Sequence, residues 1–291
     1  MSRVFEALEK ASKESHAAVV KSADEPVAVA ERSPQREAFR PNGENGSLAG
    51  HGRSWREKAE EFLFGGDLRN YESFPIVALE QGSPAAEQYK ILREQVRKLR
   101  GPAGTRIISV TSPIKRDGKS TVSANLAAAL ALEYGEQVLL IDCDLRNPQM
   151  HQYFGLSRNP GLTDYLTSSS TGNLLNYVQQ SSLPGLQLLA AGKSAGLSSE
   201  LLAMDKMHTI FTEIREKFPN HQIIVDSPPV LSTPEPLILS AQVDGIIMVI
   251  RASKTPRDCL VEAIESLKTD KLLGIVLNGA ELGITSKYYY Y

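Results

Sequence analysis

Apolar residues in the later three quarters of the chain fall into short, continuous runs rich in β-branched side chains. Runs that are apolar throughout, rather than at every second position, are typical of strands covered on both faces. The runs predict strands over residues 106–111, 137–142, 186–191, 222–226, 245–251 and 273–278. The stretches between them predict helices over 118–134, 198–218, 234–242 and 256–268. This alternation predicts an α/β fold with a mainly parallel central sheet flanked by helices.

The first 75 residues follow a different pattern. Apolar side chains at helical spacing predict a short amphipathic helix over residues 2–12, with a frayed tail as the alternative. Scattered Pro, Gly, Ser and charge over 13–52 are typical of a disordered linker. A second short helix is predicted over 55–64. We therefore expect a largely disordered N-terminal segment at 1–75, a folded domain at 76–287 and a C-terminal tail at 288–291.

Composition and charge exclude several classes of protein. Hydrophobic residues make up 42% and charged residues 23%, an ordinary globular balance, and the net charge of −2 gives no argument for a nucleic-acid partner. No run approaches the roughly 18 apolar residues of a membrane span, and the N-terminus lacks the apolar core of a signal peptide. Cys143 and Cys259 form neither a disulfide framework nor a metal spacing, so we expect a cytoplasmic protein.

A phosphate-binding loop is predicted directly after the first strand. Residues 111–121 read TSPIKRDGKST and lead into an alanine-rich helix, which is the strand–loop–helix setting of a Walker A motif. Backbone N–H groups at the helix start would bind phosphate oxygens. Lys119 would reach the β- and γ-phosphates of ATP, and the Ser120 hydroxyl would bind Mg²⁺. The predicted ATP-binding residues of this loop are Asp117, Gly118, Lys119, Ser120 and Thr121.

The loop departs from the usual pattern at its centre. Pro113 stands where the first glycine is usual, and residues 115–117 are Lys-Arg-Asp where glycine is commoner. If these positions need a positive φ, the arginine there costs about 1 kcal/mol or more. A solvated turn before a helix is the alternative interpretation.

Acidic residues mark the ends of two other predicted strands. Asp142, Asp144 and Arg146 alternate at the end of the second strand, so they share one face of an extended chain. Asp226 ends the fourth predicted strand. Carboxylates buried side by side cost several kcal/mol unless a cation compensates, and Mg²⁺ with ATP would do so. The alternative is that an aspartate simply pairs with Arg146.

These three motifs together resemble the Walker A, A′ and B motifs of the bacterial tyrosine kinases of capsule and exopolysaccharide synthesis. The resemblance covers about residues 80–291 and implies a P-loop NTPase fold like that of MinD and ParA. It implies catalytic roles for Lys119, Asp142 and Asp144, with Asp142 and Asp144 helping to hold Mg²⁺ and to activate the incoming tyrosine. It implies that Mg²⁺ is bound by Ser120, Asp142 and Asp226. It further implies that Arg146 and Asn278 contact the nucleotide.

The C-terminus carries a run of tyrosines, Tyr288, Tyr289, Tyr290 and Tyr291. Adjacent side chains at a terminus cannot all face one core, so a substrate tail explains them better than a packed one. The family resemblance implies that these tyrosines are the phosphoacceptors of autophosphorylation. Each phosphate adds about −1.5 to −2 charges. Repulsion between them is expected to release the tail from a neighbouring active site and loosen an oligomer.

The helical stretch at 84–100 carries charges three or four residues apart: Glu87, Lys90, Arg93 and Arg97. A solvated charged face is one interpretation. The family carries a Glu-x-x-Arg-x-x-Arg motif here that makes ring-like subunit contacts, so the resemblance implies oligomer contacts by Glu87, Lys90 and Arg93. Lys90 stands at the first arginine position, and lysine cannot form the bidentate fork.

The resemblance also implies partners. They are a second copy of the chain, phosphorylated in trans, and a separate polytopic membrane activator that would hold the protein at the inner face of the membrane. Two other functions remain open. A ParA- or MinD-like switch ATPase would carry a second loop lysine at position 114, where Ile114 stands, with Lys115 one place away. A regulatory pseudokinase is favoured by Arg116 in the loop.

Overall fold

The computed structural model describes residues 76–80, 82–99, 104–133, 135–168, 173–193 and 205–280. The helices predicted at 2–12 and 55–64, the linker between them and the tyrosines at 288–291 lie outside the described residues. The predictions for those segments therefore stay predictions.

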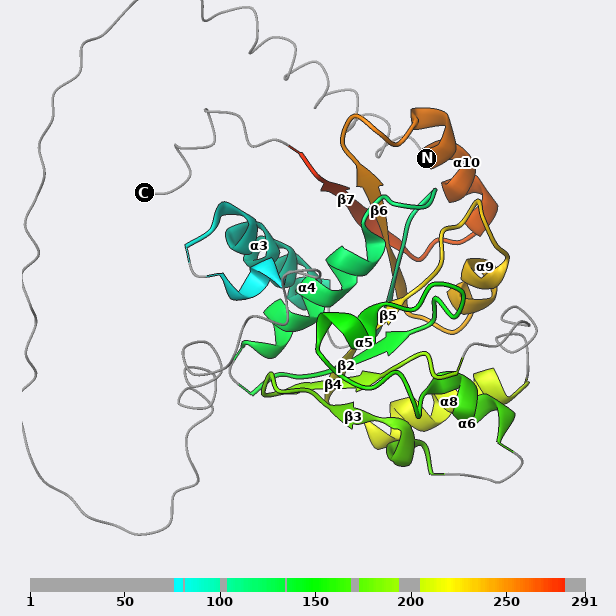
Figure 1. The fold of residues 1–291 in the computed structure, drawn as a ribbon. Coiled ribbons are helices and arrows are strands. Elements are labelled where there is room, and N and C mark those ends of the chain that lie inside the picture. The colour runs from blue at the N-terminus through cyan, green and yellow to red at the C-terminus, as the bar shows by residue number, and fades with distance from the viewer. Residues whose placement is uncertain are drawn as a thin grey trace, which may run out of the picture. The chain divides into compact units, whose positions relative to one another are not determined.

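A seven-stranded sheet forms the centre of the described domain, with the strand order β3-β4-β2-β5-β1-β6-β7 (Figure 1). Every neighbouring pair is parallel except β3 and β4, which confirms the predicted mainly parallel sheet. The strands are β1 (Ile107–Thr111), β2 (Gln137–Asp142), β3 (Gln179–Gln180), β4 (Leu186–Leu189), β5 (His221–Asp226), β6 (Gly245–Arg251) and β7 (Leu272–Asn278).

Helices cover both faces of this sheet. One apolar core lies under α3 and α4, and the other lies under α6, α8 and α10. The helices and 3-10 turns are η2 (Val77–Leu79), α3 (Pro84–Leu99), α4 (Lys119–Ala131), α5 (Met150–Tyr153), α6 (Leu162–Thr167), η3 (Leu174–Tyr177), α8 (Asp205–Lys217), α9 (Glu235–Ser240) and α10 (Arg257–Leu267). The structure thus confirms the predicted α/β class.

Helix α4 is buried on all sides, which explains its composition. Its alanines allow close packing against β2 and β5 on one side and against α3 and η2 on the other. Asn125 is fully buried in α4, and its side-chain oxygen accepts a hydrogen bond from the backbone N–H of Ala78 at 2.9 Å. The helix that follows the phosphate loop is therefore fixed in place along its whole length.

Parallel pairing brings the carboxyl ends of the central strands to one edge of the sheet. In the register of β2 and β5, Asp142 lies opposite Asp226. Val110 of β1 also lies opposite Asp226, so the loop after β1 begins beside both aspartates. Ligands of parallel α/β sheets bind at this edge.

Candidate active site

Residues 112–118 connect β1 to α4 and form the predicted phosphate loop. Gly118 precedes the helix with a φ of 95°, a left-handed conformation that glycine adopts without strain. A Cβ atom at this position would lie 1.9 Å from the side-chain nitrogen of Asn278. Glycine is therefore favoured here by the backbone conformation, and a Cβ would also displace the Asn278 amide.

Three side chains at or just beyond the carboxyl ends of β6 and β7 hold this loop, and we call Arg251, Thr255 and Asn278 the loop brace. The Asn278 amide donates to the Asp117 carbonyl at 2.9 Å, and the Thr255 hydroxyl donates to the Asp117 carboxylate at 2.8 Å. The Arg251 guanidinium donates to the Arg116 carbonyl at 3.3 Å. The brace joins the ends of β6 and β7 to the centre of the loop.

The Asp117 side chain forms a hydrogen bond within the loop itself. It is almost fully buried, and its second carboxylate oxygen accepts from the backbone N–H of Ile114 at 3.3 Å. Burial raises the pKa of Asp117, and the hydrogen bond from Thr255 opposes that rise. Asp117 was predicted to bind the cofactor, but it does not line the pocket described below. Its contacts in this structure are with the loop and its brace.

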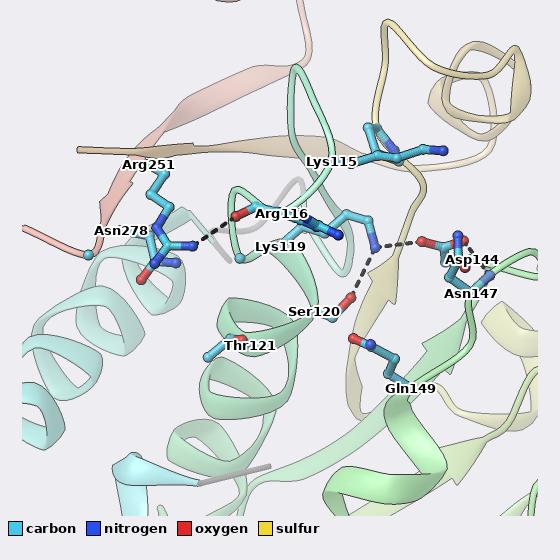
Figure 2. A pocket seen from close by; sticks show the side chains of 13 residues that line it. Lys115, Arg116, Lys119, Ser120, Thr121, Asp144, Asn147, Gln149, Arg251 and Asn278 are labelled. Carbon is cyan, nitrogen blue, oxygen red and sulfur yellow. Dashed lines mark hydrogen bonds and ion pairs between the residues drawn. The ribbon is translucent and has the colours of Figure 1, made fainter. Parts of the chain in front are cut away.

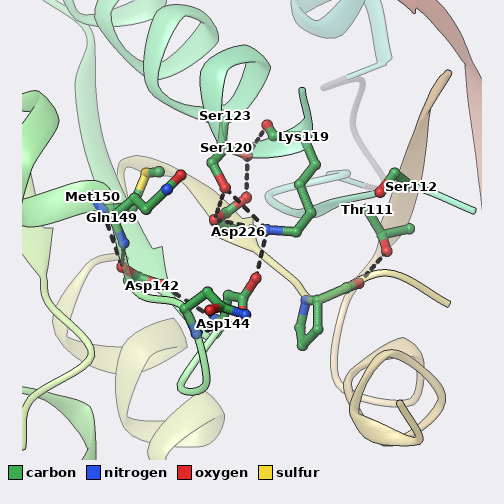
Figure 3. A network of polar contacts seen from close by, with 12 residues as sticks. Thr111, Ser112, Lys119, Ser120, Ser123, Asp142, Asp144, Gln149, Met150 and Asp226 are labelled. Carbon is green, nitrogen blue, oxygen red and sulfur yellow. Dashed lines mark hydrogen bonds and ion pairs between the residues drawn. The ribbon is translucent and has the colours of Figure 1, made fainter. Parts of the chain in front are cut away.

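Lys119 extends from the start of α4 across the strand ends (Figure 3). Its ammonium lies 2.6 Å from a carboxylate oxygen of Asp144, 3.7 Å from Asp226 and 3.0 Å from the Ser120 hydroxyl. Burial alone would lower the pKa of Lys119, but Asp226 and Asp144 outweigh it and raise that pKa. The lysine therefore stays charged where the start of α4 meets the segments at the ends of β2 and β5.

Asp226 at the end of β5 is fully buried beneath the loop. It accepts hydrogen bonds from the hydroxyls of Ser120 at 2.8 Å and Ser123 at 2.9 Å, both on α4. Burial raises its pKa, while Lys119 acts in the opposite direction. The two serines thus fix the start of α4 to the end of β5.

Asp142 at the end of β2 is also fully buried. One carboxylate oxygen accepts from the backbone N–H groups of Gln149 and Met150, each at 3.0 Å, and the other accepts from Asp144 N–H at 3.2 Å. Burial and the nearby Asp226 carboxylate raise the pKa of Asp142 to about 8. Both buried aspartates are therefore poised to gain from a nearby cation.

A pocket with a volume of about 690 Å³ opens above these strand ends, within the range of small-molecule and cofactor sites (Figure 2). The predicted site residues that line it are Gly118, Lys119, Ser120, Thr121, Asp144 and Asn278. The lining residues that were not predicted as site residues are Lys115, Arg116, Asn147, Gln149, Pro229, Arg251 and Gly279.

Two kinds of signal could have found these unpredicted residues. Asn147 and Gln149 follow Asp144 in the same segment, so closeness in sequence indicates them. Arg251 ends a predicted strand, and strand ends meet at the ligand edge of a parallel sheet. Pro229 lies three residues beyond Asp226, so closeness in sequence indicates it as well.

Arg146 lies apart from the predicted nucleotide contacts. It does not line the pocket, and its Nε atom lies 2.9 Å from a carboxylate oxygen of Glu235, a buried residue of α9. Among the described residues, the carboxylate found beside Arg146 is that of Glu235, whereas the sequence had raised one of the nearby aspartates as its partner. Arg146 instead joins the loop after β2 to α9.

The residues present fit Mg²⁺ and ATP. Mg²⁺ prefers oxygen ligands and is usually held by one or two carboxylates, waters and substrate phosphates. Ser120, Asp142 and Asp226 supply oxygens beneath the pocket, and the described residues gather no set of three His, Cys, Asp or Glu side chains that could hold a metal by themselves. Waters and nucleotide phosphates would complete the shell.

The charged face of α3 lies away from this pocket. Lys90 pairs with Glu87 at 2.5 Å. Arg93 and Arg97 both contact Glu133 beyond the end of α4, at 3.0 and 2.5 Å. Arg93, predicted to contact another subunit, therefore has a partner within its own chain, while the predicted oligomer contact stays a prediction.

Within the described ranges, we find no helix with the length and apolar character of a membrane span.

Comparisons with known proteins agree with this geometry. A family model described as an AAA domain matches residues 105–271. The chain is 34% identical over 218 residues to the tyrosine-protein kinase YwqD of Bacillus subtilis (strain 168), covering 74% of this chain and 90% of that protein. It is 30% identical to the tyrosine-protein kinase ptk of Acinetobacter johnsonii over 73% of this chain, but spans 28% of that longer protein.

The solved structures that match this chain include a tyrosine kinase domain. The kinase domain of the Escherichia coli tyrosine kinase ETK matches with a TM-score of 0.66 and 25% identity, covering 73% of this chain and 83% of that one.

Proposed function

This chain belongs to the bacterial tyrosine kinases, and we propose that it transfers the terminal phosphoryl group of MgATP to tyrosine hydroxyls, those of Tyr288–Tyr291 among them. The observation that carries the proposal is the position of Lys119. Its ammonium joins the phosphate loop to Asp144 across the pocket, 2.6 Å from that carboxylate. A phosphate-binding cation and a candidate proton acceptor therefore face the same space.

Each chain group has a role in this proposal. Lys119 and the N–H groups at the start of α4 bind phosphate oxygens and hold the transferred group in place. Ser120, Asp142 and Asp226 would hold Mg²⁺, which when bound neutralises charge on the phosphates. Asp144 lines the pocket and would accept the proton of the tyrosine hydroxyl, a general-base role that requires hydrogen-bond reach of the acceptor.

The proposed acceptor is the tyrosine run of a second copy of the chain. Strand β7 ends at Asn278, which lines the pocket, so nine residues separate this lining residue from Tyr288. At about 3.3–3.6 Å per residue this length reaches roughly 30 Å. This length would allow the tail to reach the pocket of a second copy, and the α3 residues Glu87, Lys90 and Arg93 would form the contact between the two copies.

The proposed setting is the inner face of a cell membrane, where a separate polytopic membrane protein of the polysaccharide export type would activate the kinase. Self-phosphorylation would then regulate capsule or exopolysaccharide synthesis. The family membership and the tyrosine run support this proposal. Repeated phosphorylation places several negative charges next to one another, so it is expected to release the tail and loosen the oligomer.

A phosphate-transfer assay tests the proposed activity. Purified protein is incubated with Mg²⁺, γ-labelled ATP and a random Glu-Tyr copolymer, and label in polymer and in free phosphate is counted separately. The proposal expects label on tyrosine that is lost in Lys119→Met and in the presence of EDTA. Free phosphate without labelled tyrosine would instead support a switch ATPase, and neither product would support a pseudokinase.

A further inference from the structure

We propose that the Arg116 side chain is a second phosphate-binding cation of the pocket, which makes this protein prefer a nucleoside triphosphate over the diphosphate. The inference rests on the proposed nucleotide site and adds a specificity residue to it. It concerns the position where the loop departs most from the usual glycine-rich pattern.

Arg116 has an unfavourable backbone conformation. Its φ is 70°, in the left-handed region that costs a non-glycine residue roughly 1–2 kcal/mol. Glycine would adopt the same conformation without that cost. Strained residues of this kind concentrate at functional sites, where the side chain or the conformation is used. The presence of arginine here therefore calls for a use of its side chain.

The loop does not need that side chain to keep its shape. The Arg116 carbonyl is held by Arg251, and the next carbonyl, that of Asp117, is held by Asn278. Both contacts are made by the backbone of the loop, so they would persist with glycine at position 116. The Arg116 guanidinium is left exposed, and no carboxylate in the described part of the chain forms an ion pair with it.

The direction of the side chain supports a phosphate-binding role. Arg116 lines the pocket, and Figure 2 shows its side chain beside that of Lys119, whereas Lys115 extends away from both. Lys119 is partly neutralised by Asp144, the acidic residue of the lining. A guanidinium binds phosphate oxygens through a planar fork of donors. Arg116 would thus add an uncompensated cation where the additional phosphate of a triphosphate brings further negative charge.

Calorimetric titration of the purified chain tests the inference with Mg²⁺ and either ADP or the non-hydrolysable triphosphate AMPPNP. Arg116→Gly should weaken AMPPNP binding about tenfold or more, as expected for a lost charge-assisted hydrogen bond, and weaken ADP binding much less. Arg116→Lys should keep part of the preference because it retains the charge. The melting temperature of the unliganded Arg116→Gly protein should not fall, since glycine suits this backbone.

Lys268 provides a matched control. It is an exposed cation with a φ of 44° at the end of α10, outside the pocket lining. Lys268→Gly removes the same charge and the same kind of backbone strain. Because Lys268 lies outside the pocket lining, this change should leave both nucleotide affinities unchanged. Should Arg116→Gly fail to fold, Arg116→Asn repeats the test with a neutral residue that tolerates the left-handed region.

Equal AMPPNP affinity in wild type and Arg116→Gly, or an equal loss for ADP and AMPPNP, would overturn the inference. These results are separate from the proposed kinase activity. If the wild-type protein labels no tyrosine, the proposed function is contradicted. If Arg116→Gly nevertheless removes the preference for the triphosphate, the role of Arg116 is supported. Tyrosine labelling with no effect of Arg116→Gly on binding does the reverse.

Discussion

The ammonium of Lys119 lies 2.6 Å from the carboxylate of Asp144, although Lys119 begins helix α4 and Asp144 follows strand β2. Both side chains are largely buried, so the pair is only weakly screened by water. A nucleotide phosphate would compete with Asp144 for the same ammonium. Asp144 is therefore expected to oppose nucleotide binding while it serves the transfer of the phosphoryl group.

Replacing Asp144 with Asn should separate these two effects. Without the carboxylate, Lys119 is free to bind phosphate and one negative charge leaves the pocket, so ADP affinity should rise several-fold. The rate of tyrosine labelling should fall about 10²-fold or more, the range typical of a lost general base. Calorimetry and a labelling time course measure the two quantities. Asp270→Asn, at an exposed position outside the pocket, should change neither.

The loop brace predicts a graded effect at Thr255. Thr255→Val keeps the shape of the side chain but removes the hydrogen bond to the buried Asp117 carboxylate. We expect the KM for ATP to rise about three- to tenfold, as a hydrogen bond to a charged group suggests, with a smaller effect on kcat. Thr255→Ser retains the hydroxyl and should restore the wild-type KM. If both variants show the same KM, Thr255 does not position the loop.

Asp142 predicts a pH dependence of nucleotide binding. Its raised pKa of about 8 means that the carboxyl group holds a proton at neutral pH, and Mg²⁺ must displace that proton. The affinity for ADP with Mg²⁺ should therefore increase as pH rises from roughly 6 toward 8, and flatten once the group is ionised. Calorimetry in buffers of different ionisation enthalpy should detect the released proton.

Asp142→Asn is the control for this pH dependence, because the ionisation of ADP itself is the same with both proteins. The variant should bind MgADP more weakly at pH 8 and show a flatter profile. A profile as steep as that of wild type would exclude Asp142 as its source.

Asp244 predicts a different pH effect, on stability. Burial alone would raise the pKa of Asp244, but hydrogen bonds from Arg215 and from the N–H groups of Arg106 and Ile107 lower it. A lowered pKa stabilises the fold above the ordinary value of about 3.9, and this contribution is lost as pH falls through the lowered pKa.

Asp244→Ala should therefore reduce the free energy of unfolding at pH 7 by about 1–3 kcal/mol. Urea unfolding curves should show the difference from wild type shrinking as the pH is lowered to about 3. A difference that is constant over this range would mean that the charge of Asp244 is not involved.

Much of the fold could be predicted because its strands are continuous apolar runs. The six predicted strands correspond to β1, β2 and β4–β7, and the helix after the phosphate loop was predicted within a few residues. Strand β3 was missed because two glutamines carry no strand pattern. Helix α6 was missed as well, whereas α9, which is equally short, was predicted over 234–242.

The site was predictable where chemistry and local sequence coincide. Lys119, Ser120 and Asp144 follow recognisable strand ends and line the pocket together. The loop brace could not be predicted, since Thr255 lies 138 residues from its partner Asp117. Asn278 was expected at the nucleotide and does line the pocket, but its contact with the Asp117 carbonyl depends on the pairing of β6 and β7.

Substitution of the C-terminal tyrosines tests which residues accept the phosphoryl group. Replacing Tyr288–Tyr291 with Phe should abolish self-labelling while leaving nucleotide affinity unchanged, because the change removes the proposed acceptor hydroxyls and keeps every pocket-lining residue. Labelling that persists in this variant would place the acceptor tyrosines elsewhere in the chain.

Mass spectrometry of the C-terminal peptide after incubation with Mg²⁺ and ATP tests the central claim most directly. The wild-type protein should carry phosphate on one or more of Tyr288–Tyr291. Lys119→Met should carry none, because the loss of one preorganised contact to the transferred group typically costs about 3–4 kcal/mol. An unmodified tail in the wild-type protein, or equal modification in Lys119→Met, would contradict the account.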